Sequence, residues 1–428
     1  MNAELEGLAT NPALPAFLLD RLVHDPSLAS ELAGRTDLTP ARVRTLLSHG
    51  DSSATHGLLR AGLAAPADVP LLNESVALVV TSHPDADPGV ARVLAHHPDA
   101  TVRAELPEWA FALPPDVIDL LAADPSPDVV SELVLFHTTP LRDHSSPEVR
   151  SALARSQHTP ADVLASLSAE SLARELASNP ATPAAVAADL MRWPACRYYL
   201  AERTDLPAAL YEQLALELEP GVLSNLASNP AVPVHVLRSL AVTTPLRRAV
   251  LHNPAIPLDL LVELAPVART GAKLVPRVES ASAAELSALG SSPVEQVRKM
   301  VASVAATRAD AAGLEELARL GSWLHPRIAS NPLCTPELLH RMASGGSAKT
   351  LRAVAQHPAA SGETLLLCLE DARARYLAAA HPNLPVDSIV ELLASEFTAG
   401  AAASNPSLPV PVMEHLADGG GYAILVCG

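Results

Sequence analysis

The sequence predicts an all-α fold, a right-handed superhelical α-solenoid of about seventeen repeats, each roughly 24–25 residues long. Two patterns recur along the chain: a proline-bearing turn followed by apolar residues at helical spacing, and a shorter apolar pattern before each turn. The composition is a third observation, because 49% of the residues are hydrophobic but only 3% are aromatic. A core this poor in Phe, Tyr and Trp is typical of a thin, repeated layer of Ala, Leu and Val.

The longer helix of the repeat is clearest in residues 227–241, ASNPAVPVHVLRSLA. Asn229 serves as the anchor, the position from which each repeat is counted, and Pro233 follows at +4. Apolar residues then come at the spacing of one helical face, namely Val236, Leu237 and Leu240. We expect this helix to begin at the second proline, because the first helical turn makes no use of the missing N–H. A preceding threonine is a good N-cap, as at Thr39, Thr159, Thr182 and Thr335.

A shorter helix is predicted before each anchor, from apolar pairs at −7 and −3 that lie one helical turn apart, such as Val222 and Leu226. The repeat is therefore a short helix, a proline-bearing turn and a longer helix. The predicted anchors are Asn11, Thr36, a residue near Ala61, His83, Trp109, a residue around His137, Ser156, Asn179, Arg203, Asn229, Asn253, residues near Ser280 and near Val304, Asn331, His357, His381 and Asn405.

The repeats predict one continuous solenoid over residues 1–417, with weak units near 136–146 and 266–282. These units are either degenerate repeats or insertions that carry function. We expect Met1–Leu8 to form a polar cap at one open end. Residues 418–428 are a Gly-rich hinge followed by an apolar tail. The tail either covers the last helix or is offered to a partner through Tyr422, Cys427 and Gly428.

Charge and cysteine content exclude several classes of function. The net charge of −17 argues against indiscriminate binding to nucleic acid or anionic membranes. No leader or membrane-spanning segment is recognisable, so we expect a cytoplasmic protein. Only 3 of the 30 basic residues are Lys, which suggests a bacterial source. The four cysteines are far apart and form no CxxC, so we expect small core residues, no metal site and no cofactor.

The units SNPAVPVHVLRSLA, HNPAIPLDLLVELA and SNPATPAAVAADLM resemble the leucine-rich repeat variant family. That family is a bacterial α-solenoid, related in architecture to HEAT and armadillo proteins, whose unit of about 24 residues alternates two helices, one of them short and 3₁₀-like. The resemblance covers nearly the whole chain and implies the fold, but it says little about activity. The best-known member carries a cysteine-ligated iron–sulfur cluster ahead of its repeats. No cysteine occurs here before Cys196, so no such cluster is implied.

The sequence shows none of the motifs GxxxxGK[ST], GxGxxG, HExxH or GxSxG, and we therefore expect no catalytic activity. The 16 histidines invite a metal site. His83, His357 and His381, however, hold the anchor position that Asn holds in other repeats. A shared position implies a shared structural role, which we expect to be hydrogen bonding to the backbone of the turn.

An arginine recurs six residues before the anchor, with one example displaced by one position. These candidate binding residues, which we call the arginine ladder, are Arg103, Arg150, Arg197, Arg247, Arg298, Arg352 and Arg375. In one interpretation each guanidinium bonds carbonyls or carboxylates of an adjoining unit, such as Glu148 beside Arg150. In the other, the arginines form a basic strip in the concave groove that binds an acidic peptide or a phosphate backbone.

The most economical function is a non-catalytic scaffold or adaptor that binds a protein or peptide, for which an acidic partner would suit, on its concave face. The alternative is a nucleic-acid-binding or DNA-glycosylase-like HEAT-type protein that uses the arginine ladder. Only 3 Trp residues occur in the chain, too few for a base-stacking platform. A glycosylase also needs a carboxylate beside a base-sized pocket, so the sequence disfavours nucleic acid as the partner.

Overall fold

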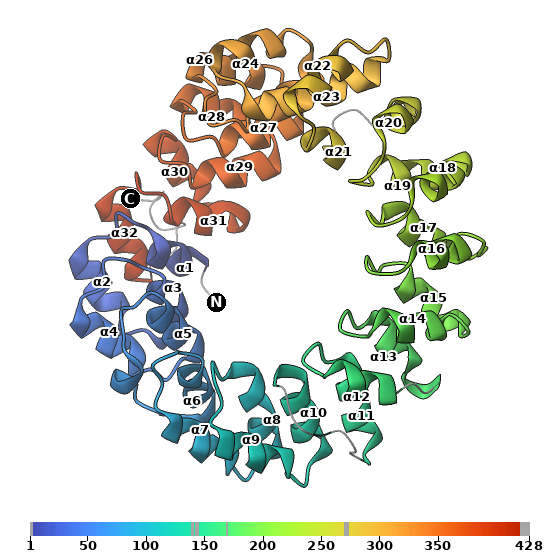
Figure 1. Ribbon diagram of the computed structural model, residues 1–428. Helices are drawn as coiled ribbons and strands as arrows, with labels where there is room; N and C mark the ends of the chain where they lie inside the picture. Colours follow the sequence, from blue (N-terminus) through green and yellow to red (C-terminus); the bar gives the residue numbers. More distant parts are fainter. Residues whose placement is uncertain (1–2, 138–140, 142–144, 168–169, 269–273, 420–428) are drawn as a thin grey trace. The chain divides into compact units, whose positions relative to one another are not determined.

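The computed structural model describes residues 3–137, 141, 145–167, 170–268 and 274–419. Every regular element within these ranges is an α-helix or a 3₁₀-helix, and they contain no strand. The predicted all-α solenoid is confirmed. None of the described helices has both the length and the apolar character needed to span a bilayer. The chain divides into two compact units, one built from both ends of the chain and one from its middle (Figure 1).

The terminal unit consists of the described residues of Met1–Ala86 and Ala302–Gly428. Its elements are α1 (Ala3–Thr10), α2 (Ala16–Leu22), η1 (Pro26–Leu28), α3 (Ala29–Ala33), α4 (Pro40–Leu47), α5 (Ser52–Arg60), η2 (Pro66–Asp68), α6 (Glu74–Thr81), α24 (Ala311–Ala318), η6 (Ser322–Leu324), α25 (His325–Ile328), α26 (Pro336–Ala343), α27 (Ala348–Ala355), α28 (Gly362–Cys368), α29 (Ala372–Ala379), α30 (Val386–Leu392), α31 (Glu396–Ala403) and α32 (Val410–Ala417).

The central unit is Asp87–Val301. Its elements are α7 (Pro88–Ala95), α8 (Ala100–Trp109), α9 (Pro115–Ala122), α10 (Pro127–Phe136), α11 (Pro147–Arg155), α12 (Ala161–Ser166), η3 (Glu170–Leu172), α13 (Ala173–Ser178), α14 (Ala184–Leu190), α15 (Pro194–Leu200), α16 (Ala208–Leu214), α17 (Pro220–Ser228), α18 (Val234–Val242), η4 (Thr244–Leu246), α19 (Arg247–Leu251), α20 (Leu258–Leu264), η5 (Ala265–Val267), α21 (Pro276–Glu279), α22 (Ala283–Gly290) and the start of α23 (Glu295–Arg308).

Within each unit the helices form two rows. The helices that precede the anchors, which we continue to call the short helices, contact one another along one row, as α27, α29 and α31 do in the terminal unit and α15, α17 and α19 in the central unit. The expected difference in length is wrong in the terminal unit, because α27, α29 and α31 have 8 residues each whereas α28 and α30 have 7. Figure 1 shows α26, α28 and α30 in the second row of the terminal unit. The core between the rows consists mainly of Ala, Leu and Val; Leu226 and Leu237, for example, are fully buried. The expected thin aliphatic core is confirmed.

The proline-bearing turns are of two kinds. At Thr39 and Thr335 the threonine caps the helix, accepting a hydrogen bond from the third residue on, and the next residue is a proline in the first helical turn, as predicted. Pro233 instead lies outside its helix, with φ −56° and ψ 142°, and α18 begins at Val234. The expected proline start is wrong there, because ψ near 140° is extended backbone. Thr159 and Thr182 precede prolines of this second kind, so the expected threonine caps are wrong at these two positions. Their buried hydroxyls have no hydrogen-bond partner in the described part of the chain.

Irregular repeats occur where the sequence pattern is weak. α10 and α11 pack directly on one another, and within 136–146 residues 138–140 and 142–144 lie outside the described part of the chain. Within 266–282, α21 has only 4 residues, and residues 269–273 are likewise outside the described part. The expected anchor near Val304 is wrong, because α23 runs for 14 residues through it. Its sequence, EQVRKMVASVAATR, has no Pro or Gly to end the helix.

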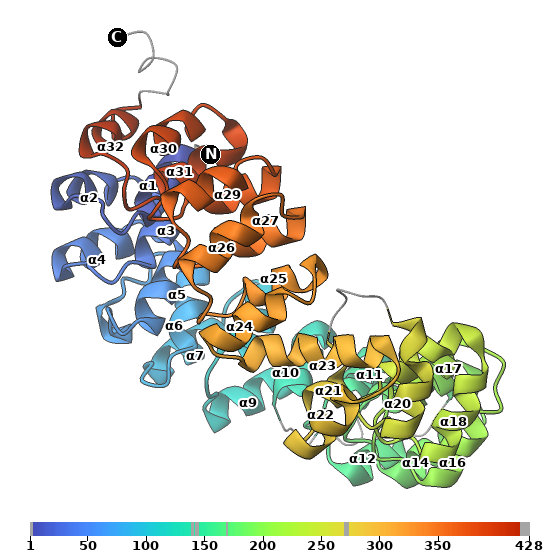
Figure 2. The same cartoon turned by 90° about the horizontal axis from the view of Figure 1, so that it is seen from above.

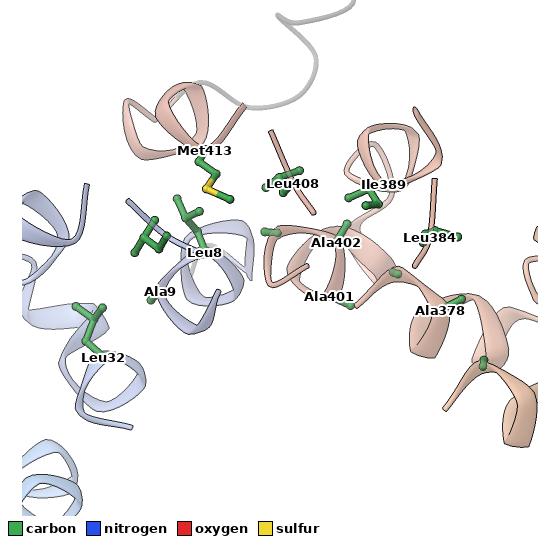
Figure 3. Packing of buried hydrophobic residues seen from close by; sticks show 14 of the residues in the cluster. Leu8, Ala9, Leu32, Ala378, Leu384, Ile389, Ala401, Ala402, Leu408 and Met413 are labelled. Atoms are coloured by element: carbon green, nitrogen blue, oxygen red, sulfur yellow. The ribbon is translucent and has the colours of Figure 1, made fainter. Parts of the chain in front are cut away.

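In the terminal unit the first repeat packs on the last. α1 lies against α31 and α32, as Figures 1 and 2 both show. Leu8 enters one core with Ala402 and Met413 (Figure 3). On the surface, Arg21 and Asp418 form an ion pair of 2.7 Å. The expected polar cap at Met1–Leu8 is therefore wrong, because α1 buries its apolar side against the carboxyl-terminal repeat.

The α1–α31 contact depends on glycine. A Cβ atom at Gly7 would lie 2.0 Å from the Gly400 carbonyl oxygen, and one at Gly400 would lie 2.8 Å from the Ala3 carbonyl oxygen. Such distances are far inside van der Waals contact, so only glycine allows the two backbones to approach this closely. Small residues at this point therefore specify how the two ends of the chain meet.

Candidate functional site

The anchor asparagines connect each repeat to the one before it. The Asn405 amide donates from Nδ2 to the carbonyls of Ala379 and His381, both at 2.8 Å, and its Oδ1 accepts the Ser407 N–H at 2.8 Å. The same three-bond pattern is made by Asn11, Asn179, Asn229, Asn253 and Asn331. Asn11 makes it with Ala403 and Asn405, so these bonds continue from the last repeat to the first. We call this series the anchor ladder.

Histidine replaces asparagine in two consecutive repeats. His381 Nε2 lies 3.0 Å from the His357 carbonyl oxygen, and its Nδ1 accepts the Asn383 N–H at 3.1 Å. His357 makes the equivalent bonds with Asn331 and Ala359. This arrangement requires neutral imidazole with the proton on Nε2. The expectation that anchor histidines bond the turn backbone is confirmed, including at His83, whose Nδ1 accepts the Asp85 N–H.

A fall in stability on acidification is expected from His381. Burial lowers the pKa of its imidazole below the ordinary value. The bond to the His357 carbonyl opposes this shift, and the charge of the nearby His357 imidazole adds to it. Because the folded pKa is depressed, this contribution to stability is present above about pH 6.5 and is lost as the pH falls through the folded value. Urea midpoints from pH 8 to pH 5 should fall less steeply for His381→Asn than for the wild type. Identical slopes would contradict this role.

Arginine replaces the anchor asparagine in two other repeats. Arg203 donates from Nη1 to the Asn179 carbonyl and from Nη2 to the Thr182 carbonyl, both at 2.6 Å, and it pairs with Asp205. Arg35 likewise bonds the backbone of the preceding repeat and pairs with Asp37. Arg203 was predicted as an anchor, and the sequence Arg-Thr-Asp-Leu, which begins at both arginines, could have identified Arg35 as well.

Two predicted anchors are shifted by one residue. In the second repeat Arg35 is 8% exposed and bonds the first repeat, so it, and not the exposed Thr36, is the anchor. At Trp109 the side chain is 37% exposed, whereas the next residue, Ala110, is buried. Both errors arose because neither repeat has Asn or His to fix the count.

The arginine ladder mainly caps the helices of the longer row. Five of its members donate to the carbonyl six residues earlier, at or just after the end of the preceding longer helix. These bonds join Arg103 to His97, Arg197 to Met191, Arg247 to Ala241, Arg298 to Ser292 and Arg375 to Leu369, at 2.7–3.1 Å. The geometry agrees with the first of the two interpretations, in which the guanidinium groups bond the backbone.

Carboxylates complete the arginine ladder at some positions. Arg103 forms a two-bond ion pair with Asp124, and Arg352 does so with Asp371. The Arg352 bond, together with backbone N–H groups, lowers the pKa of Asp371 to about 2. The suggested pair of Arg150 and Glu148 is not formed, because the Glu148 carboxylate accepts from the Ser146 hydroxyl. Among the described residues the Arg150 side chain has no hydrogen bond or ion pair.

Arg103→Met is expected to lower the urea midpoint at pH 7, because it leaves the Asp124 carboxylate, whose side chain is 6% exposed, without its cation. The Arg103 bond holds the pKa of Asp124 below its usual range, so the contribution is present above about pH 4 and is lost as the pH falls through the folded pKa. The difference in urea midpoint from wild type should therefore shrink at pH 3. Arg92→Met is the matched control, because its pair with Asp116 is exposed. Equal losses in the two variants would contradict a role for burial.

The described cysteines are buried core residues, as expected. Cys196, Cys334 and Cys368 are unpaired, and burial raises the pKa of Cys334 and of Cys368 to about 11. Their thiols are therefore poor nucleophiles at neutral pH. Groups of three or more potential metal ligands do not occur among the described residues. The tail candidates Tyr422, Cys427 and Gly428 lie outside the described part of the chain.

Comparison with known proteins agrees with the repeat geometry. One segment of the chain matches the model of a known domain family. It contains the anchors Asn331 and His357 and the helices α24 to α27. Residues 298–358 match the Leucine Rich Repeat Variant domain. The match is shorter than the nearly chain-long resemblance seen in the repeat pattern. No curated protein sequence matches the chain.

From this leucine-rich repeat variant segment onward, the solvent side of the short helices carries changing side chains. Eight residues before successive anchors come Trp323, Lys349, Arg373 and Phe397, on or beside α25, α27, α29 and α31. These four helices are neighbours in one row. Lys349, Arg373 and Phe397 are exposed and Trp323 is partly exposed. The sequence analysis missed this position because it has no common residue type.

Proposed function

We propose that the chain is a cytoplasmic, non-catalytic scaffold that binds a protein or peptide along the solvent face of a short-helix row. The observation that carries this proposal is that each repeat has two kinds of position, one that bonds the scaffold and one that varies on the surface. Anchor side chains and most ladder arginines bond the backbone of the scaffold, while the position eight residues before the anchor changes from Trp to Lys, Arg and Phe. A regular frame that displays varied side chains is typical of solenoids that bind extended partners.

The arginine ladder gives less support to nucleic-acid binding. A phosphate contact needs guanidinium N–H groups that are free to turn toward the ligand. Arg197 and Arg375 instead donate to carbonyls at the end of the preceding repeat, and Arg352 holds Asp371 with two bonds. Binding through these arginines would require bonds that stabilise the helix ends to be broken.

Panning a random twelve-residue peptide display library against the full chain tests the proposal. Selected peptides would be synthesised with a fluorescent label, and their binding measured by fluorescence anisotropy. We expect saturable binding with micromolar affinity, about −8 kcal/mol. A labelled duplex DNA, measured at 50 and 200 mM salt, is the comparator, because binding through phosphates weakens steeply with salt. Failure to select any saturable peptide would contradict the scaffold, and salt-sensitive DNA binding would then favour the nucleic-acid alternative.

A further inference from the structure

Basic residues are concentrated on three neighbouring short helices of the terminal unit. α25, α27 and α29 contain five cationic side chains and no acidic one: Arg327, Lys349, Arg352, Arg373 and Arg375. The whole chain has 47 acidic and 30 basic residues, so this distribution is unlike the rest of it. The next helices in the row are acidic, with Glu396 in α31 and Glu4 and Glu6 in α1. The basic stretch is therefore limited to about three repeats.

Three of these five cationic side chains do not bond other parts of the described structure. Arg352 is paired with Asp371, and Arg375 bonds the Leu369 carbonyl. In contrast, the side chains of Arg327, Lys349 and Arg373 make no hydrogen bond or ion pair within the described residues. Lys349 and Arg373 are exposed at equivalent positions of consecutive repeats, so both can meet one ligand that follows the row.

An exposed aromatic pair adjoins the free cations. Tyr376 follows Arg373 by one turn of α29 and is 46% exposed, and Phe397 in α31 is 58% exposed. Their ring centroids are 5.5 Å apart at an interplanar angle of 51°. Large exposed aromatic side chains in contact with one another are a feature of binding surfaces.

We propose that the face formed by Lys349, Arg373, Tyr376 and Phe397, here named the cation–aromatic face, binds an extended acidic peptide. This inference rests on the scaffold function proposed above and names its partner. Carboxylates of the peptide pair with Lys349 and Arg373, the guanidinium being able to hold a carboxylate with two bonds. A large apolar side chain of the peptide packs on Tyr376 and Phe397.

The repeat spacing sets the spacing of the acidic residues. Packed helices lie about 8–10 Å apart, and an extended chain advances about 3.3 Å per residue. Carboxylates that meet Lys349 and Arg373 are therefore about three residues apart, and the apolar residue follows about three residues further on, toward Phe397. A long polyanion fits less well, because Glu396 and the net charge of −17 repel it beyond the basic stretch.

The selected peptides and one charge-reversal variant test this assignment. We expect peptides retained by the wild-type full chain to carry Asp or Glu at three-residue spacing, and Lys349→Glu/Arg373→Glu to weaken their binding at least about tenfold. Arg44→Glu/Arg60→Glu is the matched control. It makes the same change in net charge at two exposed arginines of the terminal unit, and it should leave the affinity within about twofold. Thermal melting checks that both variants are folded.

Each other outcome rejects a different statement. Selected peptides that lack acidic residues, or that bind Lys349→Glu/Arg373→Glu as tightly as wild type, overturn the cation–aromatic face but leave the scaffold function standing. A library that yields no binder overturns the scaffold function itself. A labelled twelve-nucleotide poly(dT) probe that binds the wild type more tightly than the acidic peptides and is lost in Lys349→Glu/Arg373→Glu assigns the face to nucleic acid and overturns the peptide assignment.

Discussion

Gly7→Ala is expected to destabilise the terminal unit by about 3 kcal/mol, although the same change in a helix ordinarily stabilises it by about 0.5–1 kcal/mol. The added Cβ atom would lie 2.0 Å from the Gly400 carbonyl oxygen and 2.9 Å from its Cα atom. Both obstacles are backbone, so a side chain cannot rotate to relieve the clash. α1 must move away from α31, and the Asn11 bonds to Ala403 and Asn405 must lengthen.

Gly57→Ala provides the matched control for this prediction. Gly57 lies in α5 of the same unit, and a Cβ atom there would meet the Ala33 Cβ at 3.5 Å, an ordinary contact. We expect this variant to be as stable as wild type or slightly more so, which gives the two substitutions opposite signs. Thermal and urea unfolding measure the global effect, and hydrogen exchange over Ala3–Thr10 and Glu396–Ala403 measures the local one. Equal shifts for the two variants, with unchanged exchange, would contradict the close approach of α1 and α31.

The contact between the two ends was not predictable from the repeat pattern. The anchor spacing shows that each unit bonds the unit before it, and by that rule Asn11 should have no earlier unit to bond. The structure supplies one, because Asn11 bonds the Asn405 carbonyl as Asn405 bonds the His381 carbonyl. A sequence period describes neighbours along the chain, whereas Gly7 and Gly400 are brought together by packing between opposite ends of it.

The local chemistry, in contrast, was largely predictable. Asn229, Asn253 and the anchor histidines share one position because all of them can bond the backbone of the turn, as the sequence indicated. Their second bond, to the backbone of the preceding repeat, was not predicted. The sequence located the ladder arginines but did not show which groups their guanidinium N–H groups bond. Each side chain turns toward the nearest acceptor, and for Arg375 this is the carbonyl of Leu369 at a helix end.

The cation–aromatic face left no periodic signal at all. Lys349 and Phe397 occupy the same position in different repeats but have opposite physical character. Core positions repeat because each must fill the same volume between two rows. Solvent-facing positions are free of that constraint, so a pattern search passes over them, and they become apparent only when burial separates the two sides of each short helix.

Asn253→Asp is expected to cost at least about 4 kcal/mol at pH 7, the largest loss among single anchor substitutions. Asn253 is fully buried, and its amide donates to the carbonyls of Ala227 and Asn229, each at 2.9 Å. A carboxylate of the same shape would set negative oxygen against both carbonyls. Asn253→Ala removes the same donors without adding charge, so we expect a smaller loss of about 3 kcal/mol from the unpaired buried groups.

Asn253→His is the matched control, because histidine holds the anchor position at His357 and His381 and keeps one donated and one accepted bond. We expect its urea midpoint to lie closest to that of wild type. The carboxyl group introduced by Asn253→Asp should have a raised folded pKa; its protonated form then regains a donor, so stability relative to wild type is recovered at low pH and lost as the pH rises through that pKa. An Asp variant as stable as the His variant at pH 7 would show that the anchor bonds contribute little. Because each anchor joins two successive repeats, a loss at one anchor also weakens the packing between its neighbours. The stabilities of the variants, rising from Asp to Ala to His, therefore measure how much the anchor hydrogen bonds contribute to the stability of this solenoid beyond the contribution of the aliphatic core.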